Sequence, residues 1–196
     1  MTLTEGLFAM NSPARFHEVV ELGPQHEGEL KRLLVNLNPE SRASRFNCAA
    51  SDALLLRHSQ RALTTTAWLA GTIIHQRLSG VVEVYDMCSP GAVEAAFLVD
   101  EGWRRRGLGT ALLKAAVQWA TKRDRVLLRM TFSRNNWPMR RLAANAGARL
   151  DLSFDEVVAD LPIAPAAHLK HSCGDWPTRQ QNYSLEVEQR GRTSEH

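Results

Sequence analysis

An arginine- and glycine-rich segment in the second half of the chain has the residue types and spacing of a phosphate site. It reads Arg104-Arg105-Arg106-Gly107-Leu108-Gly109-Thr110. Glycine lets the backbone approach a ligand without a Cβ clash, and the first turn of a following helix leaves amide hydrogens unpaired. The helix dipole and the forked donors of arginine favour an anion at the same point. The segment therefore predicts a site for a phosphate or a pyrophosphate.

The spacing of the two glycines excludes the two commonest nucleotide-binding loops. A P-loop has four residues between its glycines and a lysine after the second, whereas here one residue separates them and Thr110 follows Gly109. A dinucleotide-binding loop has a third small residue where this chain has Leu112, and an acidic residue about 20 positions further, where residues 126–130 include none. The phosphate ligand is therefore of another kind.

The residues on both sides of the loop favour alternating strands and helices. Residues 91–99 are almost all apolar, as in a buried strand, and Glu94 is the exception. Apolar residues recur at helical spacing after the loop, and Asn and Pro open a later segment in the manner of a helix start. We expect a strand over 91–99, a helix from Gly107, a strand over 126–132, and a helix from Trp137 that ends at Gly147.

This order of elements, with the spacing Arg-x-x-Gly-x-Gly, resembles the GNAT family of N-acetyltransferases, whose loop binds the pyrophosphate of acetyl-CoA. The resemblance covers residues 16–160. It implies an α/β fold with a central mixed, twisted sheet of about six to seven strands flanked by helices, and acetyl-CoA as cosubstrate. The residues that it assigns to cofactor binding are Leu98, Val99, Arg104, Arg105, Arg106, Gly107, Leu108, Gly109, Thr110 and Asn136.

A second, more specific resemblance lies upstream. Residues 37–46 read Leu-Asn-Pro-Glu-Ser-Arg-Ala-Ser-Arg-Phe, which is similar to a helix in the acetyltransferase domain of bacterial protein-lysine acetyltransferases. Those enzymes also carry a glutamate on the strand, ten residues before the first basic or Gln position of the loop. Here that residue is Glu94, counted from Arg104. The resemblance makes Glu94 the expected catalytic residue. It also slightly favours a protein lysine as the acceptor of the acetyl group.

The chemistry explains why such a carboxylate is needed. An alkyl ammonium has a pKa near ~10.4, so a base must remove its proton at neutral pH before the nitrogen can attack a thioester. Glu94 would take that proton directly or through one water. By resemblance, the strand amides of Leu98 and Val99 would hold the pantetheine arm and polarise the thioester carbonyl. The resulting reaction is direct transfer of an acetyl group to a primary amine, without a covalent enzyme intermediate.

One position departs from the family pattern. Many members carry a tyrosine seven residues after the Asn that corresponds to Asn136, and it protonates the leaving thiolate; here that position is Ala143. Coenzyme A can leave as a thiolate, because thiols have pKa values near ~8.5. Tyr85, on the preceding strand, is a candidate substitute for the missing acid. Alternatively, the chain is an acyl-CoA-sensing module that has lost catalysis.

The acceptor amine stays open at this stage, between a protein lysine and a small amine such as a polyamine or an aminoglycoside. A small polycationic acceptor needs a group of carboxylates. Four acidic residues on or after neighbouring strands are candidates for such a patch: Glu83, Asp86, Asp100 and Glu101.

The N-terminal half contains weaker signals for further elements. Alternating apolar positions predict a first strand over 16–22, and amphipathic patterns predict three helices: one after Gly23-Pro24, one from Asn38-Pro39-Glu40 and one over 51–63. Two strands over 67–74 and 81–87 would be joined near Ser79-Gly80, and two short strands over 148–152 and 156–159 would follow the last helix.

Length and composition agree with one globular domain of this kind. The chain has 196 residues, 44% of them hydrophobic, and a formal net charge of +3, which does not call for nucleic acid as a partner. Its three cysteines have no paired spacing, and four of its histidines show no zinc template, so we predict no metal and a reducing, cytoplasmic location without a membrane span. The sequence does not decide whether the protein forms a homodimer. The expected division is an arm over 1–14, an acetyltransferase domain over 15–162 and a poorly ordered tail over 163–196.

Overall fold

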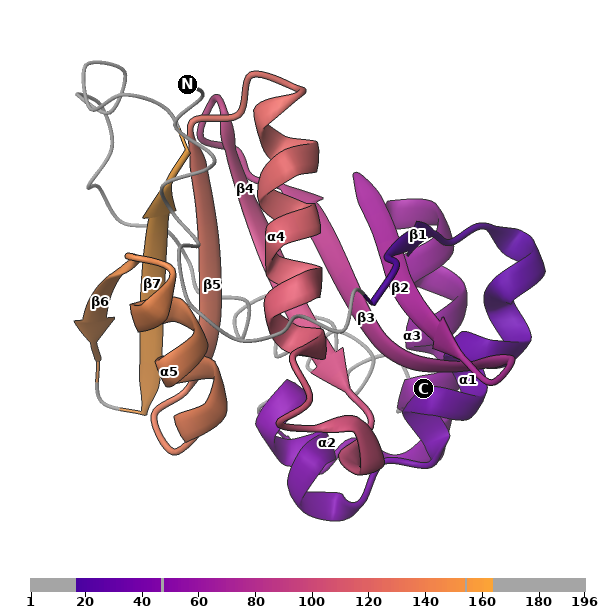
Figure 1. Ribbon diagram of the computed structural model, residues 1–196. Coiled ribbons are helices and arrows are strands. Elements are labelled where there is room, and N and C mark those ends of the chain that lie inside the picture. The colour runs from indigo at the N-terminus through magenta and orange to yellow at the C-terminus, as the bar shows by residue number, and fades with distance from the viewer. Residues whose placement is uncertain (1–16, 47, 154, 164–196) are drawn as a thin grey trace, which may run out of the picture.

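The computed structural model describes residues 17–46, 48–153 and 155–163. Three α-helices follow the first short strand of this region, three strands come next, and strands and helices then alternate from the fourth strand to the sixth (Figure 1). The strands are β1 (Val20–Glu21), β2 (Trp68–Ile74), β3 (Arg77–Asp86), β4 (Ala92–Val99), β5 (Leu127–Ser133), β6 (Arg149–Leu152) and β7 (Glu156–Pro162). The α-helices are α1 (Glu27–Val35), α2 (Pro39–Phe46), α3 (Asp52–Thr65), α4 (Leu108–Thr121) and α5 (Trp137–Asn145), and short 3-10 turns η2 (Pro24–His26) and η3 (Glu101–Trp103) precede α1 and follow β4.

The strands form one seven-stranded sheet in the order β1-β2-β3-β4-β5-β7-β6. Only the central pair, β4 and β5, is parallel, and every other neighbouring pair is antiparallel. The parallel pair needs a crossover, which α4 supplies on one face of the sheet. The expected mixed sheet of about six to seven strands is confirmed.

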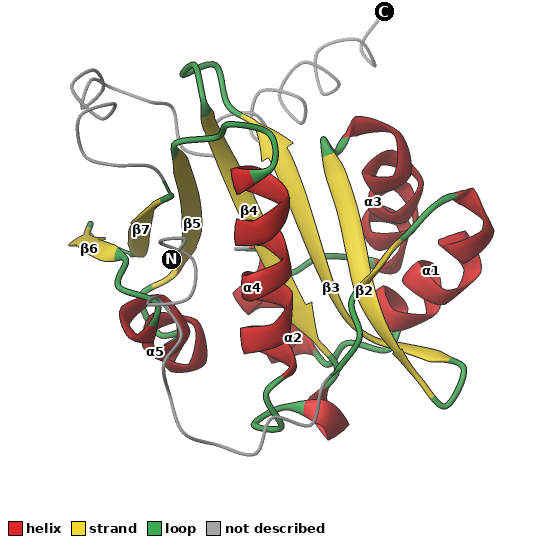
Figure 2. Ribbon diagram, turned by 45° about the horizontal axis from the view of Figure 1, so that its top comes forward, coloured by secondary structure: helices red, strands yellow, loops and turns green. Residues whose placement is uncertain are grey.

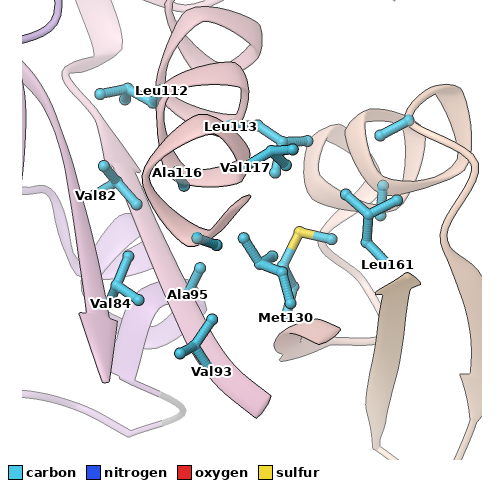
Figure 3. Packing of buried hydrophobic residues seen from close by; sticks show 14 of the residues in the cluster. Val82, Val84, Val93, Ala95, Leu112, Leu113, Ala116, Val117, Met130 and Leu161 are labelled. Atoms are coloured by element: carbon cyan, nitrogen blue, oxygen red, sulfur yellow. The ribbon is translucent and has the colours of Figure 1, made fainter. Parts of the chain in front are cut away.

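Helices cover both faces of this sheet. Side chains alternate across a strand, so Val82 and Val84 of β3 meet the α4 face while Val81 packs on the opposite side with α1 and α3. Figure 2 shows α4 in front of the strands, with α1 and α3 beyond β2 and β3. The α4 face holds the larger buried cluster, in which α5 also takes part through Ala143. Figure 3 shows the inner residues of α4 against this face: Leu112, Leu113, Ala116 and Val117.

The turn between β2 and β3 differs from the sequence-based expectation. It lies at His75-Gln76, both with positive φ (50° and 61°), and not at Ser79-Gly80. Two left-handed residues make the tight turn whose twist suits an antiparallel hairpin. Gly80 lies inside β3, where a Cβ would come within 3.1 Å of Leu112 Cδ1. That glycine therefore allows α4 to pack closely and does not mark a turn.

Other boundaries follow the expectation with smaller shifts. The first strand is limited to Val20–Glu21, at the edge of the sheet, where it pairs only with β2. The last helix ends as expected, because Gly147 adopts a left-handed φ of 83° just beyond it. The predicted arm over 1–14 and almost all of the predicted tail lie outside the described residues. Within the described ranges, no helix is long and apolar enough to cross a membrane.

Candidate active site

The sheet splits between its two central strands. β4 and β5 pair only where Ala92–Glu94 faces Leu127–Arg129, although both strands continue beyond these residues. The remaining part of β4 pairs with β3 alone, and that of β5 pairs with β7 alone. The split therefore opens at the carboxyl ends of two parallel strands, beside the loop that leads into α4 (Figure 1).

The amides of Leu98 and Val99 point in opposite directions across β4. The Asp100 N–H donates to Ser79 O at 2.9 Å, so the alternation of an antiparallel ladder directs the Leu98 N–H toward β3 as well. The N–H and C=O of Val99 then face the split. In agreement, Val99 O accepts a hydrogen bond from Arg104 Nε at 3.4 Å.

The loop between β4 and α4 exposes backbone donors, as its sequence predicts. Gly107 is the N-cap of α4 and adopts a left-handed φ of 89°, which glycine tolerates best. The first bond back into the helix runs from Ala111 N to Gly107 O at 3.0 Å, so the amides of Leu108, Gly109 and Thr110 lie in the turn that has no intrahelical acceptor. These amides and the positive end of α4 form a cradle that suits a pyrophosphate.

Two of the three loop arginines are oriented by contacts within the protein. The Arg104 guanidinium donates to the hydroxyl of Ser41 on α2 at 2.7 Å. Arg106 lies over the ring of Trp103, 5.0 Å from its centroid. Arg105 is exposed and has a positive φ of 60°. The loop thus carries three cations, of which Arg104 is held toward α2 and Arg106 toward Trp103.

Asn136 caps α5 and contacts α2 at the same time. Its Oδ1 accepts from the Met139 N–H at 3.2 Å, and its Nδ2 donates to Ser44 Oγ at 2.9 Å. The predicted cap is confirmed. Ser41 and Ser44 of one helix therefore contact residues on both sides of the split, and α2 itself contacts both β4 and β5.

Glu94 lies at the inner end of the split, in the last register pair shared by β4 and β5. It stands opposite Tyr85 on β3 and opposite Arg129 on β5, and its side chain is partly buried. Arg129 forms a two-pronged ion pair with Asp160, at 2.7 and 2.8 Å. Glu94 is therefore the acidic residue of β4 at which the pairing with β5 ends.

Ala143, the position without the family's tyrosine, is fully buried on α5 and belongs to the core on the α4 face. Among the described residues, the nearest phenol to Glu94 along the sheet is Tyr85, directly opposite it. Tyr85 donates its hydroxyl proton to Glu83 Oε2 at 2.6 Å.

Glu83 is the centre of a buried polar cluster. It is 0% exposed, and Arg45 of α2 pairs with it at 2.6 Å. His58 of α3 contacts both of its oxygens, at 3.0 and 3.1 Å, and packs edge-on against Phe46. A buried carboxylate persists only when ion pairing and hydrogen bonds offset its lost hydration. The cluster therefore fixes α2 and α3 on the sheet next to the split.

We expect Arg45→Met to lower the free energy of unfolding by about 3–5 kcal/mol, because it leaves the buried Glu83 carboxylate without its charge partner. Urea denaturation measures the change. Arg32→Met is the matched control, since Arg32 pairs with Glu29 at the surface and half of its side chain is exposed (51%); that variant should differ from the wild type by less than about 1 kcal/mol. Equal losses in the two variants would contradict a stabilising buried pair.

The four carboxylates that a polycationic acceptor would need do not share one surface. Glu83 is buried and neutralised, and Asp86 pairs with Arg125 at 2.7 Å. Asp100 caps η3, and Glu101 accepts from Asn38. No group of three or more His, Cys, Asp or Glu side chains in the described part of the chain is arranged to hold a metal ion.

Sequence comparison assigns the fold and loop to one family. The family model described as the acetyltransferase (GNAT) family matches residues 30–147, more than half of the chain. The chain belongs to the GNAT family. It is therefore an acetyl-CoA-dependent N-acyltransferase by family, and the loop before α4 is in the position where the resemblance places the pyrophosphate. A search of curated proteins found no match.

Solved structures share this GNAT fold at low sequence identity. The GNAT domain of S. lividans PAT is 19% identical with a TM-score of 0.66, over 74% of this chain and 89% of that one. The ribosomal-protein-S18-alanine N-acetyltransferase from Escherichia coli is 12% identical with a TM-score of 0.60, over 82% and 99%. The yncA structure from Salmonella typhimurium, with its cofactor acetyl-CoA, is 13% identical with a TM-score of 0.59, over 82% and 98%.

Sequence reasoning missed four residues of the site region: Arg45, His58, Ser41 and Ser44. A signal for the buried cluster was present, since Glu83 interrupts the apolar run of β3 and His58 lies on the inner side of α3 among Leu55 and Ala62. Isolated polar residues at core positions indicate partners from other elements.

Proposed function

We propose that this GNAT protein transfers the acetyl group of acetyl-CoA directly to a primary amine, with Glu94 as the base. The observation that carries the proposal is the position of Glu94 at the inner end of the split, where β4 and β5 stop pairing, while the anion cradle of α4 lies beyond the carboxyl end of β4. A ligand held at the cradle and extended along Val99 would bring its far end toward Glu94.

Each group has a defined task in the proposed reaction. Bound acetyl-CoA supplies a thioester, whose acetyl carbon gains a bond to the amine nitrogen as its bond to sulfur breaks. Glu94 takes one proton from the ammonium, which frees the nitrogen lone pair, and releases it to solvent. The nitrogen loses a second proton when the amide forms, and this proton accounts for the one on the released thiol of coenzyme A. The Val99 N–H, which faces the split between the cradle and Glu94, would hold the pantetheine arm of acetyl-CoA.

The fit to acetyl-CoA rests on the chemistry of the donors present. Three amides at the start of α4, the positive end of that helix and the loop arginines offer what a pyrophosphate needs. At Gly109 a Cβ would meet only Leu142 Cδ2, at an ordinary 3.5 Å, so packing within the protein does not require a glycine there. A close approach of ligand to backbone gives the glycine a reason.

A protein lysine is the acceptor that we propose. Helix α2, which resembles a helix of bacterial protein-lysine acetyltransferases, contacts both sides of the split through Ser41 and Ser44. Against a polyamine or aminoglycoside, Glu83 and Asp86 are already paired with cations of the protein.

A non-catalytic acyl-CoA sensor is the second candidate, favoured by one observation. Ala143 is buried in the core, so α5 offers no acid to the leaving thiol. The carboxylate retained at Glu94 argues against a sensor, because a sensor has no need for a base.

Release of free coenzyme A thiol from acetyl-CoA tests the proposal, measured with lysine peptides, polyamines and aminoglycosides in parallel. We expect turnover with lysine peptides. Turnover confined to the small amines would overturn the lysine assignment and keep the reaction. If no acceptor gives turnover while acetyl-CoA still raises the melting temperature, the sensor is the better reading.

A further inference from the structure

The phenol opposite Glu94 belongs to the buried cluster described above. Three donors converge on the Glu83 carboxylate: Arg45 at 2.6 Å, His58 at 3.0 and 3.1 Å, and the Tyr85 hydroxyl at 2.6 Å. The side chains of Arg45, His58 and Glu83 are 5%, 6% and 1% exposed, whereas Tyr85 is only partly buried. Tyr85 is thus the member of the cluster that lies directly beside the proposed base.

The direction of each hydrogen bond follows from the charges. Arginine is always protonated, so its buried partner is an ionised carboxylate, which can only accept. The Tyr85 hydroxyl therefore donates its single proton to Glu83. Whatever else this oxygen contacts, it contacts as an acceptor.

The sheet register places Tyr85 directly beside Glu94. Tyr85 and Glu94 are direct cross-strand partners, so their side chains leave the same face of the sheet with Cβ atoms about 5 Å apart. Glu83 lies two residues before Tyr85 on that face, and its Oε2 accepts the hydrogen bond that orients the phenol. On the other side of Glu94, Arg129 is held by Asp160.

We infer that Tyr85 is an acceptor-binding residue: its oxygen accepts a hydrogen bond from an N–H of the amine while Glu94 removes another proton from the same nitrogen. This inference rests on the proposed acetyl transfer. Tyr85 keeps its own proton throughout. Protonating the thiolate would instead leave a phenolate against the Glu83 carboxylate, a repulsion that opposes the acid role suggested by the missing tyrosine at position 143.

Tyr85→Phe tests the inference, since it removes only the hydroxyl. We expect the KM for the amine to rise about 10- to 100-fold, as for loss of a hydrogen bond to a charged group. The KM for acetyl-CoA should stay unchanged. Thr65→Val, which also removes one hydroxyl but lies exposed at the end of α3, is the matched control and should leave both constants unchanged. An unaltered amine KM in Tyr85→Phe would overturn the inference and leave the proposed function standing.

A series of acetyl thioesters with increasingly acidic thiols separates binding from acid catalysis. A leaving group that departs without a proton needs no acid, so the defect of Tyr85→Phe would disappear with the most acidic thiols if Tyr85 were the acid. We expect the same defect across the series. Rescue would overturn the inference, and absence of turnover by the wild type with every amine would instead overturn the proposed function.

Discussion

Glu94→Gln is expected to lower kcat about 10²- to 10⁴-fold, the usual contribution of a positioned general base. Glutamine keeps the shape of the side chain and its capacity for hydrogen bonds at the inner end of the split, but it cannot take the proton of the ammonium. Because the cradle lies at the start of α4, away from residue 94, the variant should bind acetyl-CoA as the wild type does. Steady-state thiol release and calorimetric binding of acetyl-CoA measure the two quantities.

The pH dependence of the rate defect in Glu94→Gln tests the role of Glu94 as a base more specifically. An amine that is already deprotonated needs no base, so the defect of Glu94→Gln should shrink as the pH approaches the pKa of the acceptor amine. Glu21→Gln, the same isosteric change at an exposed edge-strand position, is the control and should match the wild type. Equal rates for Glu94→Gln and the wild type at every pH would remove Glu94 from the mechanism.

The elements around the loop were predictable because their signals are local. An apolar run predicted β4, and the cap residue Asn136 predicted α5. Gly107 predicted the start of α4, since left-handed backbone and unpaired amides follow directly from the residue type. These local signals were enough to predict the cradle at the start of α4, and with it the family, without any knowledge of tertiary contacts.

The surroundings of Glu94 were not predictable in the same way. The partners of Glu83 lie 38 residues away at Arg45 and 25 residues away at His58, and no local pattern links them. The turn at His75-Gln76 was missed for another reason, because two non-glycine residues adopt a left-handed backbone there. Gly80, which resembled a turn signal, serves the packing of α4.

Helix α2 connects the loop before α4 with the buried cluster around Glu83. Its Ser41 contacts the loop at Arg104, its Ser44 contacts the α5 cap, and its Arg45 contacts the Glu83 cluster. A single eight-residue helix therefore contacts the proposed cofactor site and, through Glu83, the proposed amine site. Changes in α2 should affect both substrates, whereas Tyr85→Phe and Gly109 variants should each affect one.

Gly109→Glu is expected to weaken acetyl-CoA binding at least about 100-fold with little loss of stability. A Cβ at this position meets only Leu142 Cδ2 at 3.5 Å, and a carboxylate in the first turn of α4 interacts favourably with the helix dipole. The fold should therefore tolerate the change. The same carboxylate would stand where the pyrophosphate is proposed to bind, and two like charges about 4 Å apart near a protein surface repel by about 4 kcal/mol.

Three variants at this position separate size from charge. Gly109→Ala adds only a Cβ, Gly109→Gln adds nearly the full side chain without charge, and Gly109→Glu adds both. If repulsion dominates, the glutamate variant should bind far more weakly than the glutamine variant, and high salt should narrow the difference, because ions screen exposed charges. The rise in melting temperature with acetyl-CoA reports binding in each case. A rise in Gly109→Glu equal to that of the wild type would show that the start of α4 does not hold the pyrophosphate, and the cradle would need another ligand.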